Sequence, residues 1–344
     1  MIVLGIETSC DETSVSIVKK SKNDEKGNIL SECTLSQIKK HKKYGGVVPE
    51  LASRAHQQNI IPVVDTAIKE AGIIKEDLSA ICFTQGPGLL GSLLVGSSFS
   101  KSFALGMNIP LIAVNHMQGH IMAHFIKEEN NDKKNPKFPF ICLTVSGGHT
   151  QIVLVKSFED MNVIGETLDD AAGEAFDKSA KILGLPYPGG PLIDKYSKNG
   201  DKYKFTFGKH KVGKLNFSFS GIKTSIKRVI EKGMERNPNF INENRDDLCA
   251  SIQYTIVDIL IKKLIKASKE LGINEIAIAG GVSANSYLRE RLLELKEKYN
   301  KEVYIPKFEY CTDNAAMIAI SGYYKLLNGD FADQSVTPMS RLYF

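Results

Sequence analysis

Residues 4–18 read LGIETSCDETSVSIV, and residues 143–155 read LTVSGGHTQIVLV. Each stretch runs from an apolar segment through a polar turn into a second apolar segment, which is the pattern of a β-hairpin. Each is followed, further along the chain, by a glycine-rich turn that enters a helical segment: GPGLLGS at residues 86–92 and AGGVSAN at residues 279–285. The repetition predicts a duplicated fold of two similar lobes on either side of a cleft.

The rest of the chain alternates apolar, β-rich runs with longer segments of helical spacing, which is typical of an α/β protein. We expect a first lobe over residues 1–130 and a second over residues 131–344, with the last helix free to pack back on the first lobe. The predicted strands are Ile2–Ile6, Val15–Val18, Ala80–Thr84, Leu111–Val114, Phe140–Val145, Gln151–Val155, Glu275–Ala279 and Val303–Pro306, and the predicted helices are Pro49–Ala71, Leu89–Leu105, Ala171–Leu183, Ser220–Lys232, Asp246–Leu271, Asn285–Tyr299 and Thr312–Leu327.

The composition is that of a folded globular chain: 344 residues, 42% hydrophobic and 24% charged. The longest apolar stretches, such as Phe138–Val145, are too short to span a membrane, and the first residues lack the basic segment of a secretion signal. The net charge of +5 is compatible with a polyanionic partner. The cysteines form no CxxC pair, so we expect reduced thiols and a cytoplasmic location.

The two polar turns are candidate anion sites. Ser146, Gly147 and Gly148 allow close approach of backbone N–H groups to a phosphate, and Asp11 and Glu12 add carboxylates to the other turn. Either turn alone could be an ordinary hairpin turn. Two matching turns, together with two glycine-rich helix starts, predict a phosphate-bearing nucleotide in the cleft between the lobes.

A row of histidines forms a candidate metal site. His116 and His120 share one face of a helix at this spacing, and His124 extends the row by a turn. Met117 stands where the metalloprotease motif has its glutamate base. A third ligand has to come from elsewhere, and Asp313 is a candidate, although a helix-capping role competes there.

Further candidates are acidic or basic. Acidic residues are common in the first turn of a helix because they interact favourably with the helix dipole. Asp177 lies deeper in its predicted helix, so this explanation applies less well to it. Asp194 could reach ribose hydroxyls. Lys39–Tyr44 is a compact basic run. A second basic set comprises Lys223, Lys227, Arg228 and Lys232; both sets are either solvated surface or contacts to RNA phosphates.

Taken together, these motifs make the chain resemble the tRNA threonylcarbamoyladenosine-synthesis transferases in their bacterial form, once called O-sialoglycoprotein endopeptidases. The resemblance runs from end to end. It rests on Gly5–Ser14, Gly45–His56, Gly86–Gly96, Asn115–His120, Val145–Thr150, Asp169–Lys178, Tyr187–Pro191, Phe217–Thr224, Gly280–Asn285 and Cys311–Met317.

The resemblance implies the duplicated actin-like ATPase fold of sugar kinases and heat-shock chaperones. It implies transfer of a threonylcarbamoyl group from threonylcarbamoyl-AMP to N6 of adenosine 37 in tRNAs that read codons beginning with A, with release of AMP. It also implies a paralogous non-catalytic subunit and a small ATPase as partners, and no membrane.

The same resemblance assigns residues. It implies one divalent metal, most often iron(II), on His116, His120 and Asp313; the ligand types alone would equally suit zinc or manganese. The proton of the attacking amine could pass to Asp11, Glu12 or His149, and the sequence does not choose among them. Substrate contacts are implied for Thr144, Val145, Ser146, Gly147, Gly148, Asp177, Gly190, Asp194 and Asn285.

Three alternatives stay open from the residues. The paired histidines would also suit a metalloprotease, although the glutamate base is missing. A small-molecule kinase of the same fold would consume ATP and would not need the histidines. A non-catalytic, nucleotide-gated scaffold would keep its role without them.

Overall fold

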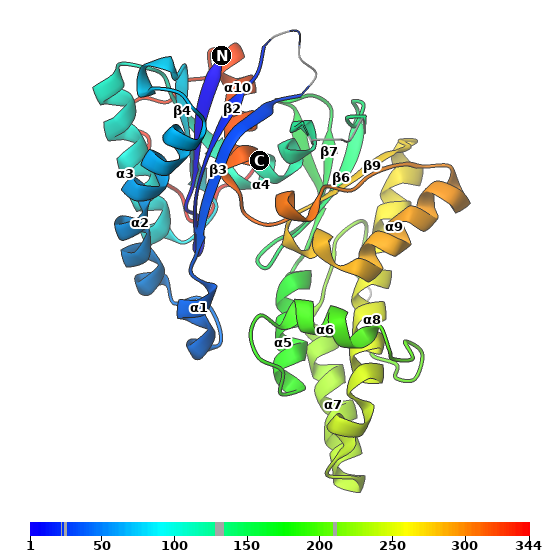
Figure 1. Ribbon diagram of the computed structural model, residues 1–344. Coiled ribbons are helices and arrows are strands. Elements are labelled where there is room, and N and C mark those ends of the chain that lie inside the picture. Colours follow the sequence, from blue (N-terminus) through cyan, green and yellow to red (C-terminus); the bar gives the residue numbers. More distant parts are fainter. Residues whose placement is uncertain (22, 24–25, 128–133, 209–211) are drawn as a thin grey trace. The chain divides into compact units, whose positions relative to one another are not determined.

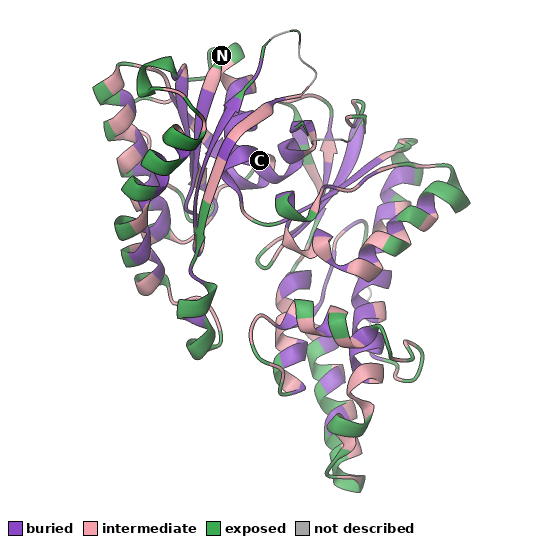
Figure 2. Ribbon diagram, in the orientation of Figure 1, coloured by how far each residue is buried: buried purple, intermediate pink, exposed green. Residues whose placement is uncertain are grey.

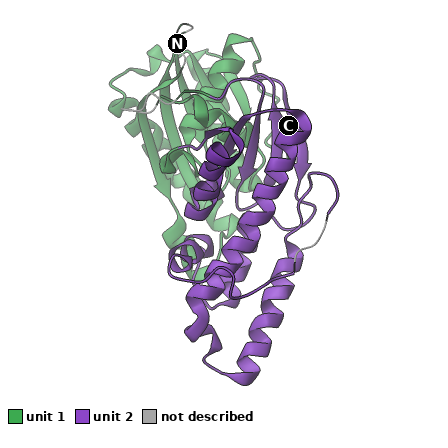
Figure 3. Ribbon diagram, turned by 90° about the vertical axis from the view of Figure 1, so that its right-hand side faces the viewer, with its two compact units in different colours: residues 1–135, 307–344 green, residues 136–306 purple. Residues whose placement is uncertain are grey.

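The computed structural model describes residues 1–344 except residues 22, 24–25, 128–133 and 209–211. The described chain forms two compact units, shown in separate colours in Figure 3: unit 1 comprises residues 1–135 and 307–344, and unit 2 comprises residues 136–306. The expected boundary between residues 130 and 131 lies outside the described residues. The expected second lobe included residues 307–344, whereas the structure groups this segment with unit 1, because helix α10 (Ala315–Leu327) covers a face of the unit 1 sheet.

Both units contain a five-stranded sheet with one topology, which confirms the α/β class and the duplication. The order is β3-β2-β1-β4-β5 in unit 1 and β8-β7-β6-β9-β10 in unit 2. In each sheet three strands form an antiparallel meander, and two further strands add parallel to the first strand of that meander. The strands are β1 (Ile2–Glu7), β2 (Glu12–Lys19), β3 (Asn28–Ser36), β4 (Ala80–Gly86), β5 (Leu111–Asn115), β6 (Phe140–Val145), β7 (Thr150–Val155), β8 (Met161–Glu166), β9 (Glu275–Ala279) and β10 (Glu302–Tyr304).

Helices cover both faces of the unit 1 sheet (Figure 1). Leu4 and Ile6 of β1 face the core formed with α2 and α3, whereas Gly5 faces α10. A Cβ on Gly5 would lie 2.7 Å from the backbone nitrogen of Ala319, so only glycine lets α10 lie this close to β1. Because side chains alternate along a strand, Glu7 faces the same side as Gly5. The helices of unit 1, besides α10, are α1 (Ile38–His41), α2 (Pro49–Glu70), α3 (Leu90–Met107) and α4 (His116–Met122).

Unit 2 packs its helices around one large apolar core. Ile141, Leu143 and Val145 of β6 point into it, together with buried side chains from every helix of the unit. The buried stripe along α8 is visible in Figure 2. The helices are α5 (Ala172–Ile182), α6 (Gly189–Ser197), α7 (Ser220–Arg236), α8 (Phe240–Leu271) and α9 (Ser286–Tyr299).

Two strands, β3 and β8, and two helices, α1 and α6, were not predicted from the sequence. The strands β3 and β8 are edge strands that mix buried, half-buried and exposed residues, so they lack a continuous apolar run. The helix α6 begins at a Gly-Gly-Pro segment, and these residue types are typical of turns. Within the described ranges, none of the helices has the length and apolarity needed to cross a bilayer.

Candidate functional site

The start of α4 places two histidines at the end of a buried strand. β5 ends at Asn115, whose Oδ1 accepts hydrogen bonds from the backbone N–H groups of Met117 (2.8 Å) and Gln118 (3.3 Å). This cap starts α4 at His116. His120 follows one turn later, and the two imidazole rings lie edge to face with centroids 4.7 Å apart. α4 ends at Met122, so His124 falls in the following 3-10 turn and does not extend the row.

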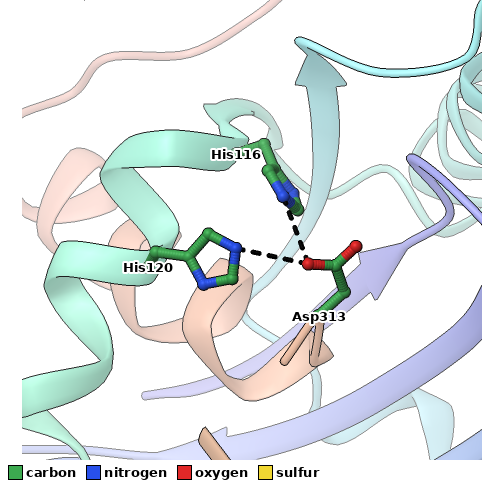
Figure 4. Close-up of side chains that lie close together, drawn as sticks. All are labelled: His116, His120 and Asp313. Carbon is green, nitrogen blue, oxygen red and sulfur yellow. Dashed lines mark ion pairs between the residues drawn. The ribbon is translucent and has the colours of Figure 1, made fainter. Parts of the chain in front are cut away.

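The third ligand type comes from the segment that precedes α10. Asn314 is the residue that caps α10, because its Oδ1 accepts a hydrogen bond from the N–H of Met317 at 2.9 Å. Asp313 is therefore not the capping residue. Asp313 Oδ1 lies 3.3 Å from Nε2 of His116 and 3.2 Å from Nε2 of His120 (Figure 4). The three residues offer ligand atoms that all lie within 4.8 Å of one another.

The close packing of α4 on α10 depends on Gly119, which lies between the two histidines. A Cβ at this position would lie 3.1 Å from Cδ1 of Ile318 and 3.2 Å from Cγ of Met317. Contacts this short are tighter than most Cβ contacts, so a larger residue would require Ile318 and Met317 to shift by a few tenths of an ångström. The glycine therefore favours the close packing of α4 on α10 that brings the histidines to Asp313.

The donor set fits a divalent metal. Nδ1 of His120 is buried and has no hydrogen-bond partner among the described residues. Nε2 of His120 faces Asp313 at 3.2 Å without hydrogen-bond geometry. Buried polar atoms are normally paired, so a buried Nε2 that faces Asp313 and His116 without a hydrogen-bond partner indicates a bound group. Two imidazoles and a carboxylate are common ligands of divalent metals.

A buried carboxylate orients the first histidine. Oε2 of Glu7 lies 2.9 Å from Nδ1 of His116 and accepts a hydrogen bond from Oγ1 of Thr84 at 2.6 Å. A proton held on Nδ1 leaves the Nε2 lone pair directed at the site, as in carboxylate–histidine–metal triads. Glu7 was not predicted as a site residue. The available signal was its position as the single charge in the otherwise apolar strand β1.

The electrostatics of the group favour a cation. Burial alone would lower the pKa of His116, but the charges of Asp313 and Glu7 raise it well above its usual value. The pKa of Asp313 is lowered despite burial, because both imidazoles lie beside it. Charges that stabilise a proton in this way would also stabilise a metal ion.

The polar turn between β1 and β2 brings two predicted catalytic residues to the same region of unit 1. Burial, followed by the charges of Asp313 and Asp11, raises the pKa of Glu12 to about 9. The same charges, together with burial, raise the pKa of the Cys10 thiol. Oδ2 of Asp11 is buried and has no hydrogen-bond partner in the described part of the chain.

The corresponding turn of unit 2 joins β6 and β7. Ser146 N–H donates to the carbonyl of His149 at 2.8 Å, and His149 N–H donates to Oγ of Ser146 at 3.1 Å. Gly147 and Gly148 are exposed, and their N–H groups have no partner among the described residues. The predicted residues Thr144 and Val145 are fully buried in β6, so they support the turn and do not line it.

The other predicted binding residues of unit 2 are already hydrogen-bonded within the protein. Oδ1 of Asp177 accepts from the N–H groups of Gly189 (2.9 Å) and Gly190 (3.0 Å), which caps α6. Asp194 accepts from Oγ of Ser286 at 2.7 Å.

The side chain of Asn285 has two partners. Its Nδ2 donates to Gln253 at 2.6 Å, and its Oδ1 caps α9. These bonds hold α6, α8 and α9 together around a cavity of about 190 Å³, whose lining includes Gln253 and Ser286.

Solved structures share this fold. Full-length HypF in its phosphate- and nucleotide-bound form aligns over 94% of this chain and 46% of that one, with a TM-score of 0.58 and 14% identity. T. kodakarensis HypF aligns over 97% and 49%, with a TM-score of 0.57 and 12% identity. At these identities the likeness concerns the fold alone. The chain is an α/β protein with the actin-like ATPase fold and a His-His-Asp group in unit 1.

Curated relatives identify the family. Proteins named tRNA N6-adenosine threonylcarbamoyltransferase are 59% identical over 342 residues in Christiangramia forsetii and 56% identical over 341 residues in Phocaeicola vulgatus, covering 99% of this chain and 98% of each relative. The one from Thermosipho africanus is 50% identical and covers 99% of both chains. The family model of the same description matches residues 28–320. The chain belongs to the tRNA N6-adenosine threonylcarbamoyltransferase family, which confirms the resemblance.

Proposed function

We propose that this protein transfers the threonylcarbamoyl group of threonylcarbamoyl-AMP to N6 of adenosine 37 in tRNAs that read codons beginning with A. The observation that carries the proposal is the convergence of His116, His120 and Asp313 in a chain of this family. A metalloprotease would need a glutamate beside the first histidine, where this chain has Met117. A small-molecule kinase of the same fold would have no use for the buried imidazoles.

His116, His120 and Asp313 would hold the metal through two imidazole nitrogens and a carboxylate oxygen. Three protein ligands leave coordination positions open for substrate, as in catalytic metal sites. We propose iron(II), on the basis of the family resemblance; zinc and manganese fit the same donors. The bound metal would supply Lewis-acid polarisation of the carbamoyl carbonyl. Glu7 and Gly119 set the orientation and spacing of these ligands.

Unit 2 would hold the AMP part of the substrate. The exposed N–H groups of Gly147 and Gly148 are donors for the phosphate, and Thr144, Val145 and Ser146 support that turn. Asp177, Gly190, Asp194 and Asn285 would fix the ribose and base. Their internal hydrogen bonds hold these groups in place before the nucleotide binds, which lowers the entropic cost of binding.

The chemical step forms a bond from N6 of adenosine to the carbamoyl carbon and breaks the bond from that carbon to the phosphate oxygen. The electron pair leaves with AMP, and the amine loses one proton. An aromatic amine is a weak nucleophile, so positioning has to supply much of the rate. Asp11, Glu12 and His149 are the candidate acceptors. A pKa of about 9 keeps Glu12 protonated at neutral pH, which favours Asp11 or His149.

The proposed reaction also fixes the partners and the compartment. The substrates are tRNA and threonylcarbamoyl-AMP. Members of the family are expected to work with a paralogous non-catalytic subunit and a small ATPase, and we propose the same for this chain. A tRNA substrate and six cysteines that form no disulfide bond agree with a cytoplasmic location.

Reconstitution tests the proposal directly. The purified protein is combined with unmodified tRNA, threonine, bicarbonate, ATP, the adenylate-forming enzyme and the partner proteins, and the nucleosides are analysed by mass spectrometry. We expect threonylcarbamoyladenosine with the wild type, loss of product by at least 100-fold with His116→Ala, and retention with His124→Ala. Absence of product with active partners, or casein cleavage that disappears in His116→Ala, would refute the proposal.

A further inference from the structure

A group of exposed cations follows β3 in unit 1, at the lower end of the unit in Figures 1 and 2. None of these cations forms an ion pair with a described residue. The sequence between Glu32 and Glu50 contains no acidic residue. The positive charge of this surface is therefore not compensated locally. We call it the lysine turn; it consists of Lys39 and Lys40 on α1, Lys42 and Lys43 on the following 3-10 turn, and Tyr44.

The lysine turn includes an exposed aromatic ring. Tyr44 is 53% exposed, and Nζ of Lys43 lies 4.9 Å from the centre of its ring. An exposed ring beside several cations suits a nucleic acid, because the cations bind phosphates and the ring stacks on a base. A surface of lysines alone would suit any polyanion, so the ring is what favours RNA.

The lysine turn is held in place by a buried histidine. His41 lies between the two pairs of lysines and is fully buried. Its Nδ1 accepts a hydrogen bond from the N–H of Val48 at 3.2 Å, and its Nε2 lies 3.3 Å from Oε1 of Gln37. The cations therefore project from a fixed backbone, which reduces the entropy lost when they bind a ligand.

The same network continues to the turn that carries the candidate catalytic carboxylates. The N–H of Gln37 donates to the carbonyl of Asp11 at 2.9 Å. Nε2 of the buried His56 lies 3.5 Å from Nε2 of Gln37 and 3.0 Å from the carbonyl oxygen of Cys10. Nδ1 of His56 lies 2.8 Å from Oγ1 of Thr13. The lysine turn is thus joined through His41 and Gln37 to Asp11, within the segment that holds the candidate catalytic carboxylates.

We propose that the lysine turn binds the substrate RNA, with phosphates of the anticodon arm on the lysines and an unpaired base or ribose on Tyr44. Because it is hydrogen-bonded to the segment that contains Asp11 and Glu12, RNA bound there has a fixed position relative to the His116–His120–Asp313 group within unit 1. The inference rests on the proposed function, since it takes tRNA as the substrate.

Salt-dependent binding tests the lysines. Binding of the full-length protein to unmodified tRNA is measured by filter binding over a range of salt concentrations. Replacing Lys39, Lys40, Lys42 and Lys43 by Gln should weaken binding at least 10-fold near 100 mM salt. The slope of the logarithm of the association constant against the logarithm of the salt concentration should also become shallower by about 2 to 3, because each lost phosphate contact changes this slope by about 1.

A matched control removes the same charge from unit 2. The control replaces Lys223, Lys227, Arg228 and Lys232 of α7, which are equally exposed, by Gln. The inference predicts a smaller loss of affinity and a smaller change of slope for this control. Equal losses for the two variants would show a general effect of net charge and would overturn the inference.

A second variant tests the aromatic ring. Tyr44→Ala should weaken tRNA binding about fivefold or more without changing the salt slope, because stacking releases no counterions. Tyr44→Phe should bind like the wild type. Since Tyr44 is exposed, both variants should fold, and a thermal melt checks this.

Several results would overturn the inference. One is a four-lysine variant that binds tRNA as tightly as the wild type does. Another is a wild-type protein that does not bind tRNA. A third is a four-lysine variant that no longer binds phosphatidylserine vesicles, as the wild type does, but still binds RNA with unchanged affinity. The proposed function is tested separately, by formation of threonylcarbamoyladenosine. If the four-lysine variant binds tRNA normally and forms the product, the proposed RNA surface is refuted and the proposed function is not.

Discussion

Glu7 and His116 form a buried pair in unit 1, with Oε2 of the carboxylate 2.9 Å from Nδ1 of the imidazole. Burial would raise the pKa of Glu7, but the neighbouring imidazole lowers it below its usual value, so the carboxylate stays ionised. Thr84 fixes the carboxylate from the other side. The pair therefore sets which nitrogen of His116 points at Asp313, and it gives a testable role to a residue outside the ligand set.

Neutralising that carboxylate should weaken metal binding. Glu7→Gln keeps the size of the side chain but makes it a poorer acceptor for the Nδ1 proton. Loss of such an outer partner typically lowers metal affinity 10- to 100-fold. Calorimetric titration of the metal-free protein with Mn²⁺ measures the effect. Glu50→Gln, which changes an exposed carboxylate of the same unit, is the control; equal affinities for the two variants would contradict the role of Glu7.

Substitutions at the adjacent residues Asp313 and Asn314 should separate metal ligation from helix capping. Asp313→Ala should abolish measurable Mn²⁺ binding and leave the cap of α10 in place. Asn314→Ala removes the cap of α10 and should lower that free energy by about 1 kcal/mol, with a smaller effect on metal affinity. Denaturant unfolding and calorimetry on both variants check this. The opposite pattern would show that Asp313 is the cap.

A methyl group at Gly119 should loosen the site. Gly119→Ala would place its Cβ near Met317 and Ile318, so α4 should move away from α10 and Mn²⁺ affinity should fall several-fold. The control is Gly106→Ala on α3, where a Cβ meets nothing within 4 Å. There the change should stabilise the protein by about 0.5–1 kcal/mol through helix propensity, with metal affinity unchanged. Equal metal affinities for the two variants would refute the spacing role of Gly119.

A half-buried carboxyl group beside α10 should make stability depend on pH. Burial raises the pKa of Glu32 to about 7, above the value of 4.5 for an exposed glutamate. The folded state then holds a proton that the unfolded state has released, so this contribution is present below pH 4.5 and is lost as the pH rises through 7. Glu32→Gln should reduce the loss of stability between pH 5 and 8 by about 1–3 kcal/mol. Denaturant unfolding at several pH values measures this, and parallel pH profiles for wild type and variant would contradict it.

Much of the fold follows from local pattern. The predicted strands and helices correspond to the main elements, since buried strands such as β6 and helices such as α2 carry their own periodicity. The edge strand β3 was missed because its residues are mostly half-buried. α6 was missed because its start is capped by Asp177, a residue from another helix.

The candidate site was predictable only in part. The spacing of His116 and His120 places them on one face of a helix, which a sequence can show. Glu7 and Thr84 could not be assigned to His116, since their contact depends on how β1 and β4 lie beside the start of α4. The internal bonds of Asp194 and Asn285 likewise depend on the packing of α6, α8 and α9.

From residue order alone came the α/β class, the repeated hairpin and the family, because strand and helix periods and short motifs are local properties of a chain. Only the folded molecule showed that Asp313 meets His116 and His120 and that Asn314 makes the cap. The physical reason is that long-range contacts arise where helices and strands pack: glycines at positions 5 and 119 let α10 lie close to β1 and α4, and that close approach brings the carboxylate to the imidazoles.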